Sequence, residues 1–249
     1  MEILKEFSLG YASPAQKSVL AALSRGPIVE DAFFLTGGTA LSVFYLGHRV
    51  SEDIDLFTRE PLDLPAVTDI VLQPWGGEIT VGVRESSFVS VFIRNVKVDF
   101  VVDPLSELEE RPVADLEFGG RLTVDSLEAI AANKLATLLG RVEPKDFIDF
   151  YFLQKEFPRL KADPIFERAK RKDAIFDDPS EAAMRLKEGL RIILRSAPEA
   201  MARDIDGVRH HGLIPYPRLL KPVDWTEFGR VFEDLGDWLM RHGEPNVNR

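Results

Sequence analysis

The chain has 249 residues, of which 45% are hydrophobic and 29% are charged, and this balance excludes a disordered chain, a collagen or a coiled coil. Cysteine is absent, so disulfides, thiolate catalysis and cysteine-ligated metal centres are excluded as well. The net charge is −10, with 15 Lys and Arg against 25 Asp and Glu in residues 1–160, and 16 against 16 in residues 161–249. This acidic balance argues against a protein that binds duplex DNA over its whole surface.

Segments that direct a chain to or through a membrane are not evident. No apolar run approaches the ~20 residues that a transmembrane helix needs. The first residues, MEILKEFSLGYASP, contain no basic segment followed by an apolar stretch, so no signal peptide is expected. We therefore expect a cytoplasmic protein with no membrane partner.

The first part of the chain mixes strand and helix patterns. Ser13 and Pro14 mark the start of a short amphipathic helix over residues 13–23. Two further helices are expected at residues 39–46 and 62–73, the second interrupted by Pro65. Apolar runs and period-two alternation predict strands at 33–36, 54–58, 78–83, 87–93 and 96–102.

Beyond about residue 122 only helical patterns are found. They cover residues 127–139, 144–156, 163–172, 180–195 and 224–240. The sequence therefore predicts an α+β protein, with an N-terminal α/β domain over residues 1–122 and a C-terminal helical domain over residues 123–249.

Two glycines, Gly37 and Gly38, stand between a predicted strand and a predicted helix, and Thr39 follows them. Without a Cβ, glycine lets backbone N–H groups approach a bound group closely. The helix directs its N-terminal N–H groups and the positive end of its dipole at the same spot, which suits a phosphate. Alone, a Gly-Gly pair between strand and helix also fits an ordinary turn.

The triplet Asp53-Ile54-Asp55 sharpens this interpretation. Residues two apart on a strand share a face, so both carboxylates point the same way while Ile54 points into the core. Asp99 supplies a third carboxylate from a later strand, opposite the apolar positions Val98 and Phe100. Carboxylates gathered in this way favour Mg²⁺ or Mn²⁺, which bind substrate phosphates. We therefore expect a two-metal phosphoryl-transfer site, in which a carboxylate also helps to deprotonate the attacking hydroxyl.

Other metal-dependent classes also use Asp-x-Asp. Haloacid-dehalogenase-type phosphatases place it at the end of a long apolar strand, whereas Ser51-Glu52 precede it here. Glycosyltransferases use it to hold the metal of a sugar nucleotide, but they do not need a Gly-Gly-Thr element upstream. A pair of turn-facing carboxylates without a ligand is the simplest alternative.

The motifs together resemble the active-site signature of the DNA polymerase beta-like nucleotidyltransferase superfamily, and more narrowly the AbiEii-type (MenT-like) toxins. The resemblance rests on Gly37-Gly38-Thr39, on the stretch from Arg49 and Ser51 through Asp53-Ile54-Asp55-Leu56-Phe57, and on Lys134, Arg141 and Lys145-Asp146. It covers about residues 30–155. It implies a mixed sheet flanked by helices, followed by a helical bundle.

The resemblance also implies roles for individual residues. Asp53, Asp55 and Asp99 would hold Mg²⁺ or Mn²⁺ and carry the catalysis. Nucleotide binding would fall to Gly37, Gly38, Thr39, Arg49, Ser51, Lys134, Arg141 and Asp146. Lys145 departs from the arginine expected before the aspartate, and the two cations differ in hydrogen-bond geometry.

The predicted helices allow a physical interpretation of the last three residues. Lys134 lies in an apolar run and is a candidate for the β/γ-phosphates of an NTP, while Arg141 lies two turns further on. Asp146 is placed to hold the lysine, to orient Arg141, or to contact the base or ribose. Asp149 fits either this group or a plain ion pair with Lys145, one turn before it.

A polynucleotide acceptor would need a basic surface. The best candidates are Arg168, Lys170, Arg171 and Lys172, with Arg191 and Arg195 on a later helix, although such clusters are usually solvated faces. The neighbouring His210 and His211 would point apart, so a metal is not expected there.

The leading hypothesis is a Mg²⁺-dependent nucleotidyltransferase that moves a nucleotide from an NTP to an acceptor and releases pyrophosphate. The family resemblance implies a toxin of a toxin–antitoxin pair that modifies the 3′ end of tRNA and is neutralised by a cognate antitoxin. Two alternatives stay open. One is a non-catalytic homologue that binds nucleotide or a partner, and the other is transfer to a small molecule or a protein side chain.

Overall fold

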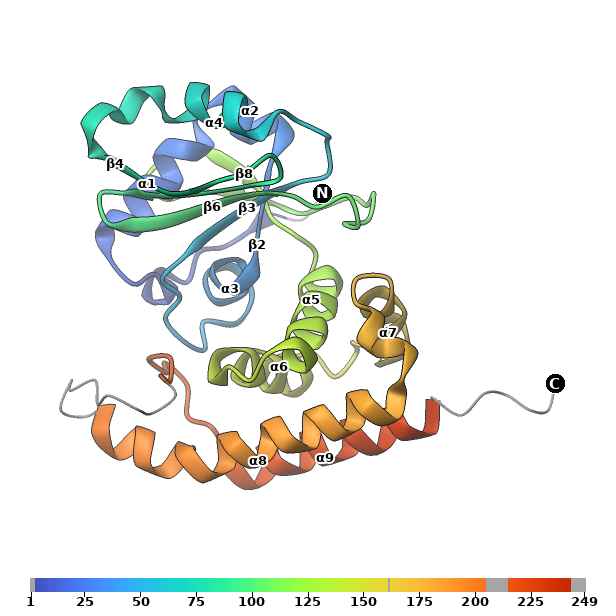
Figure 1. Ribbon diagram of the computed structural model, residues 1–249. Coiled ribbons are helices and arrows are strands. Elements are labelled where there is room, and N and C mark those ends of the chain that lie inside the picture. The colour runs from blue at the N-terminus through green and yellow to red at the C-terminus, as the bar shows by residue number, and fades with distance from the viewer. Residues whose placement is uncertain (1–2, 161, 205–214, 243–249) are drawn as a thin grey trace. The chain divides into compact units, whose positions relative to one another are not determined.

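The computed structural model describes residues 3–160, 162–204 and 215–242, so His210 and His211 lie outside the described residues. The chain divides into two compact units, Met1–Ile130 and Ala131–Arg249, called here the sheet unit and the helical unit. The sheet unit is mixed α/β and the helical unit consists of helices, which confirms the predicted fold class (Figure 1). The domain boundary expected near residue 122 stays a prediction.

A five-stranded sheet forms the centre of the sheet unit. Its order is β2 (Phe34–Thr36), β3 (Ile54–Thr58), β6 (Val96–Val102), β5 (Phe88–Ile93) and β4 (Ile79–Arg84). β3 and β6 run parallel and the other neighbours are antiparallel, so the sheet is mixed. All five strands lie where period-two alternation predicts them.

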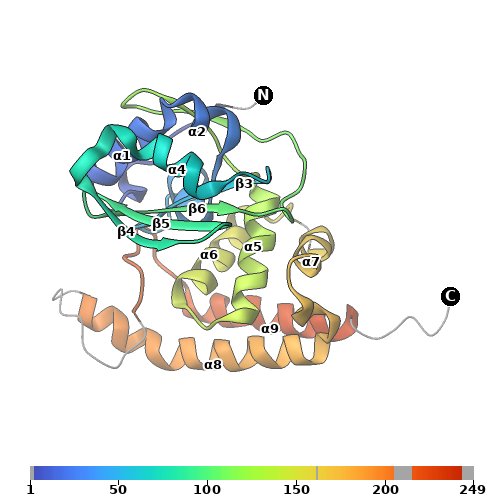
Figure 2. The same cartoon turned by 45° about the horizontal axis from the view of Figure 1, so that its top comes forward.

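One face of this sheet is apolar and covered. Ile54, Leu56, Val98 and Phe100 are fully buried on it. Helices α1 (Pro14–Ser24) and α4 (Leu64–Leu72) lie against this face in both views (Figures 1 and 2). The opposite face therefore carries the alternate residues of each strand, among them the predicted carboxylates.

The helix caps follow from the sequence. Ser13 accepts a hydrogen bond from the backbone N–H of Gln16 and so caps α1. In α4, Asp63 is the N-cap and Pro65 lies in the first turn. Proline has no N–H to donate, and the first turn has no acceptor for one, so Pro65 starts this helix instead of interrupting it.

The helical segment after β2 differs from the expected α-helix over 39–46. It starts at Gly37, as α3 (Gly37–Ala40), and continues as a π-helix, η2 (Leu41–Leu46). Gly47 has a positive φ of 57° and ends it, with its N–H bonded to the carbonyl of Ser42 at 2.9 Å. A segment of six residues is too short for its apolar periodicity to distinguish a π-helix from an α-helix, so the sequence pattern could not predict this difference.

A second, three-stranded sheet was not expected. It has the order β1 (Ile3–Leu4), β7 (Val113–Asp115) and β8 (Arg121–Thr123). Strands of two or three residues are too short to show alternation. In the main sheet, the edge strand β4 is irregular, because its register with β5 shifts between Val81 and Val83.

The helical unit holds α6 (Pro144–Glu156), α7 (Ala162–Lys170), α8 (Pro179–Asp204) and α9 (Trp225–His242), while α5 (Leu127–Gly140) begins in the sheet unit and continues into it. α8 and α9 lie side by side and antiparallel (Figures 1 and 2). An aromatic core joins α6 to α9, with the rings of Phe147 and Phe232 centred 5.0 Å apart. No helix among the described residues combines the length and apolarity of a membrane span.

Candidate active site

The register between β3 and β6 pairs two of the predicted carboxylates. Asp55 and Asp99 are direct neighbours across these parallel strands. Because adjacent strands lie about 4.8 Å apart and paired residues share a face, both side chains rise from the same spot on the sheet. Asp53 lies just before β3, two residues from Asp55. The sequence prediction of one shared face is therefore met by Asp55 and Asp99.

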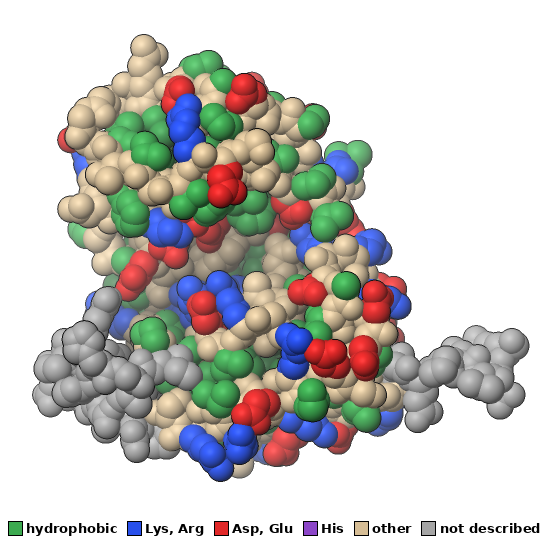
Figure 3. Space-filling model, in the orientation of Figure 1, with side chains coloured by type: hydrophobic (Ala, Val, Ile, Leu, Met, Phe, Trp, Pro, Cys, Tyr) green, Lys and Arg blue, Asp and Glu red, His purple; other side chains and the backbone are tan. Residues whose placement is uncertain are grey.

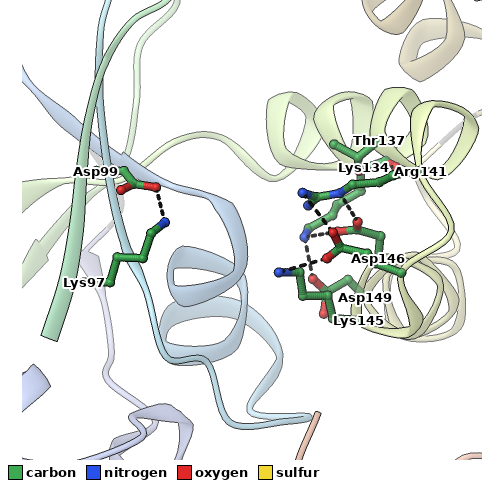
Figure 4. A network of polar contacts seen from close by, with 9 residues as sticks. Lys97, Asp99, Lys134, Thr137, Arg141, Lys145, Asp146 and Asp149 are labelled. Carbon is green, nitrogen blue, oxygen red and sulfur yellow. Dashed lines mark hydrogen bonds and ion pairs between the residues drawn. The ribbon is translucent and has the colours of Figure 1, made fainter. Parts of the chain in front are cut away.

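The Asp99 carboxylate is bonded on both oxygens. The Ser90 hydroxyl donates to its Oδ1 at 2.6 Å. The Lys97 ammonium donates to its Oδ2 at 2.5 Å (Figure 4). Ser90 is the register partner of Asp99 on β5, and Lys97 lies two residues before it on β6. Only 12% of the Asp99 side chain is exposed, so these two donors carry most of its solvation.

Lys97 is the counter-charge of the predicted carboxylates. Partial burial would lower the pKa of its ammonium, but the hydrogen bond to Asp99 and the charges of Asp53, Asp99 and Asp55 raise this pKa above the usual value. The lysine therefore carries a full positive charge within the field of the predicted metal-binding carboxylates.

Gly37 and Gly38 stand where the Cβ of any other residue would collide with a neighbouring side chain. Gly37 has a positive φ of 70°, and a Cβ there would lie 2.3 Å from Oδ2 of Asp55. A Cβ on Gly38 would lie 2.5 Å from Nη2 of Arg49 and 2.8 Å from Oγ of Ser51. The start of α3 therefore lies against Asp55 on one side and against Arg49 and Ser51 on the other.

Thr39 connects the glycine segment to the Asp-x-Asp strand. Its hydroxyl donates to the backbone carbonyl of Asp53, and the side chain of Gln16 bonds both groups, at 3.3 and 3.4 Å. Thr39 is fully buried. In this structure its hydroxyl therefore fixes the entry to β3.

The donor chemistry fits a divalent cation, since Asp53, Asp55 and Asp99 offer the hard oxygen atoms that Mg²⁺ and Mn²⁺ prefer. Because Gly37 has no Cβ, the Asp55 carboxylate can lie directly against the start of α3. Within residues 3–160, 162–204 and 215–242, however, His, Asp and Glu side chains form no group of three or more arranged to hold a metal ion. The structure thus pairs Asp55 with Asp99 but does not gather all three carboxylates into a ready metal cluster.

The predicted residues of the helical unit form a separate, buried network. The Lys134 ammonium contacts Asp146 Oδ1 at 2.8 Å and Asp149 Oδ2 at 2.7 Å, and Arg141 Nε contacts the other oxygen of Asp146 at 2.9 Å (Figure 4). Both aspartate side chains are fully buried and that of Lys134 is 9% exposed. Asp149 is therefore part of this network, and Lys145 pairs with Glu143 at 3.0 Å.

The network joins α5 to α6 and orients Arg141. Lys134 and Asp149 bring one positive and one negative charge, as do Arg141 and Asp146, so the buried charges are balanced. The Arg141 side chain is 47% exposed, and of the two cations bonded to Asp146 it is the one that solvent reaches.

The basic side chains expected to dock an acceptor are interspersed with acidic ones. On α8, Arg191 pairs with Glu188 at 2.5 Å and Arg185 with Glu181 at 2.6 Å. On the face drawn in Figure 3, blue and red side chains alternate over this part of the molecule. Charge of both signs is therefore mixed on this face, and docking of an acceptor by Arg168, Lys170, Arg171, Lys172, Arg191 and Arg195 stays a prediction.

No role is assigned to Lys97 or to Ser90 from the sequence. The signal for Lys97 was present, since Lys97 and Asp99 are two apart on a strand and share a face. Ser90 follows from the register of the β5–β6 hairpin, whose turn residues Arg94 and Asn95 have positive φ angles of 51° and 65°. Two-residue hairpins of this kind fix the register by their geometry.

A family model described as the nucleotidyl transferase AbiEii toxin of a type IV toxin–antitoxin system matches residues 19–225. The match includes every residue predicted for the site. No curated protein matches the chain.

Solved structures resemble the chain in fold. MenT4, a nucleotidyltransferase toxin from Mycobacterium tuberculosis, is 16% identical, with 91% of this chain and 83% of that chain covered and a TM-score of 0.50. JHP933 from Helicobacter pylori is 17% identical, with 93% and 94% of the two chains covered and a TM-score of 0.48. At this identity, MenT4 supports the fold alone.

Proposed function

The chain belongs to the AbiEii family of nucleotidyltransferase toxins of type IV toxin–antitoxin systems, and from this premise we propose that it transfers a nucleotide from an NTP to an acceptor hydroxyl with the help of Mg²⁺ or Mn²⁺. In this reaction the acceptor oxygen forms a bond to the α-phosphorus of the NTP, and the bond from that phosphorus to the pyrophosphate oxygen breaks. The acceptor proton passes to a base.

The observation that supports this most is the register pair of Asp55 and Asp99 beside Gly37. Two carboxylates rise from one spot of a sheet, and that of Asp55 lies directly against Gly37 at the start of a helical segment. A bound divalent cation would supply the charge that stabilises the triphosphate in the transition state. Asp53 and Asp55 would hold it, and Asp99 would complete the site and accept the acceptor proton.

The glycine segment would hold the triphosphate. The backbone N–H groups at Gly37, Gly38 and Thr39 begin a helical segment and suit a phosphate. Arg49 and Ser51 lie against Gly38 and would add charge and a hydroxyl donor to the same spot. Thr39 would act chiefly through its bond to the Asp53 carbonyl.

The helical unit would contribute to nucleotide binding through Lys134, Arg141 and Asp146. Lys134 is held by two buried carboxylates, whereas Arg141 is half-exposed and oriented by Asp146. Arg141 would therefore contact a phosphate, and Asp146 and Lys134 would set its position. A guanidinium oriented in this way makes paired hydrogen bonds to phosphate oxygens.

The acceptor that family membership favours is the 3′ end of tRNA, and the natural partner is a cognate antitoxin. Because NTP and tRNA are both found in the cytoplasm, we place the activity there.

The test is transfer of label from each NTP, in the presence of Mg²⁺ and total tRNA, by the full chain and by Asp53→Ala. We expect label in the RNA fraction with the wild type and its loss with the variant. The control is Asp69→Ala. Asp69 lies on α4 and pairs with Arg84 of β4 at 2.7 Å, so its removal should keep the activity.

Other results of this assay would change the proposal. Label in the protein fraction or on an added small molecule would replace tRNA with that acceptor. Binding of NTP with no label transferred to any acceptor, equal in wild type and Asp53→Ala, would favour a non-catalytic homologue.

A further inference from the structure

Each oxygen of the Asp99 carboxylate already accepts one hydrogen bond in the arrangement described, and one of the two donors is a cation. Its Oδ1 accepts from the Ser90 hydroxyl at 2.6 Å and its Oδ2 from the Lys97 ammonium at 2.5 Å. Ser90 is buried on the neighbouring strand, and its hydroxyl can stay bonded to one oxygen while the other binds a cation. The Lys97 contact, by contrast, places a positive charge directly against the other oxygen.

Lys97 differs from a fixed partner such as Ser90. Its side chain is 35% exposed and carries its charge on a flexible four-carbon stem. It stands opposite Phe92 on β5, whose side chain is also exposed on this face, so solvent lies next to the stem. The ammonium can therefore leave Asp99 for water without any movement of the backbone.

The charge of Lys97 acts on the whole carboxylate group. Asp53 and Asp55, together with Asp99, stabilise its ammonium. A divalent cation at these carboxylates would meet both the loss of this hydrogen bond and repulsion from a neighbouring positive charge. One site cannot favour both cations at once.

We propose that Lys97 is an internal counter-cation that competes with the divalent cation for Asp99 and has to release this carboxylate before the metal site is complete. The inference rests on the proposed function, since it takes Asp99 as a metal ligand. A purely structural ion pair on β6 would leave metal affinity unchanged, so metal affinity separates the two roles.

The experiment measures Mn²⁺ binding to the full chain without nucleotide, by calorimetry and by electron paramagnetic resonance of the free ion. A charge-assisted hydrogen bond contributes about 1.5–3 kcal/mol, so Lys97→Met should lower the Kd for Mn²⁺ by about tenfold or more. Lys97→Arg keeps the charge and should bind Mn²⁺ no more tightly than the wild type.

The chain offers a matched control. Lys155 on α6 forms an ion pair with Glu227 at 2.5 Å and its side chain is 39% exposed, so distance and lysine exposure match those of Lys97, while Glu227 is 38% exposed against 12% for Asp99. Lys155→Met removes the same charge from a comparable pair and should leave the Kd for Mn²⁺ at the wild-type value. In the double variant Lys97→Met/Asp99→Asn, the gain should disappear because the released carboxylate is gone.

The outcomes separate this inference from the proposed function. Equal or weaker Mn²⁺ binding by Lys97→Met, beside measurable binding by the wild type, overturns the competition and leaves the metal site standing. No Mn²⁺ binding by any variant overturns both. Circular dichroism of Lys97→Met checks that the fold is intact, and a gain that survives Asp99→Asn also contradicts the inference.

Discussion

Each unit holds a lysine against aspartates, and the two lysines have different surroundings. Lys97 in the sheet unit contacts Asp99 and is 35% exposed, whereas Lys134 in the helical unit is 9% exposed and contacts Asp146 and Asp149, whose side chains are fully buried. A buried pair is costly to break, because the remaining charge cannot reach water. A partly exposed lysine such as Lys97 can leave its carboxylate for water at a lower cost. A lysine paired with aspartates can thus release its partner in one unit and stabilise the fold in the other.

The largest effect should fall on activity in the sheet unit. Asp55→Asn removes a charged ligand from the register pair but keeps the shape of the side chain. We expect nucleotide transfer to fall by about 1000-fold, since the charge of the transition state loses its cation site. Labelled-NTP transfer measures it. Asp31→Asn, an exposed aspartate on α2 (Pro27–Ala32), is the control.

The next effect should fall on stability in the helical unit. Lys134→Met leaves two buried carboxylates facing each other without their shared cation. We expect the free energy of unfolding in urea to fall by about 3–5 kcal/mol. Lys97→Met should lose less, at most about 1.5–3 kcal/mol, because its ammonium is partly solvated. Unchanged stability of Lys134→Met, together with lost activity, would contradict a structural role and favour direct contact with the nucleotide.

Two glycines with similar backbone angles sharpen the contrast within the sheet unit. Gly37 has φ of 70° and Gly47 has φ of 57°, so alanine at either position costs about 1–2 kcal/mol of backbone strain. Only at Gly37 does the new Cβ meet the Asp55 carboxylate. We expect Gly37→Ala to lose about 100-fold in transfer rate through misplacement of this group, while Gly47→Ala loses stability alone. Equal rates in the two variants would show that the Asp55 contact does not matter.

The smallest effect concerns the exposed pair of Lys155 and Glu227. The Lys155 ammonium and then the Tyr151 hydroxyl hold the pKa of Glu227 below its usual range. A lowered carboxyl pKa adds stability above that range, and the contribution is lost as pH falls through the folded-state value. Wild type and Glu227→Gln should therefore differ in melting temperature at about pH 6, and the difference should shrink as the pH is lowered below the usual glutamate range of about 4.3. A difference that grows on acidification would contradict this assignment.

Much of the sheet unit was predictable from local patterns. β3 and β6 follow from alternation, because one face of each strand is buried and the other is polar. Their pairing is not local. Parallel neighbours are separated by some forty residues of chain, and no pattern in either strand states that Asp55 lies opposite Asp99.

The residues of the candidate site, whose roles stay predictions, can be picked out in the sequence, whereas their contacts cannot. Asp53, Asp55, Gly37 and Gly38 stand out by type and spacing, but the ion pair of Lys97 requires knowing how deeply the strand is buried. The burial of Lys134 likewise depends on the packing of α6 against α5, which the helix propensities of the residues do not predict. The short strands β1, β7 and β8 are defined by their pairing with one another, which no local pattern predicts.

The irregular edge of the main sheet bears on how the protein behaves at high concentration. β4 has no neighbour in this sheet beyond β5, and its Val81 and Val83 are exposed. The register shift at Gly82 breaks the row of backbone groups that a second molecule would need to add a strand. The bulge thus limits edge-to-edge aggregation at the one end of the sheet where apolar side chains reach solvent, and deleting Gly82 would restore an aggregation-prone ladder.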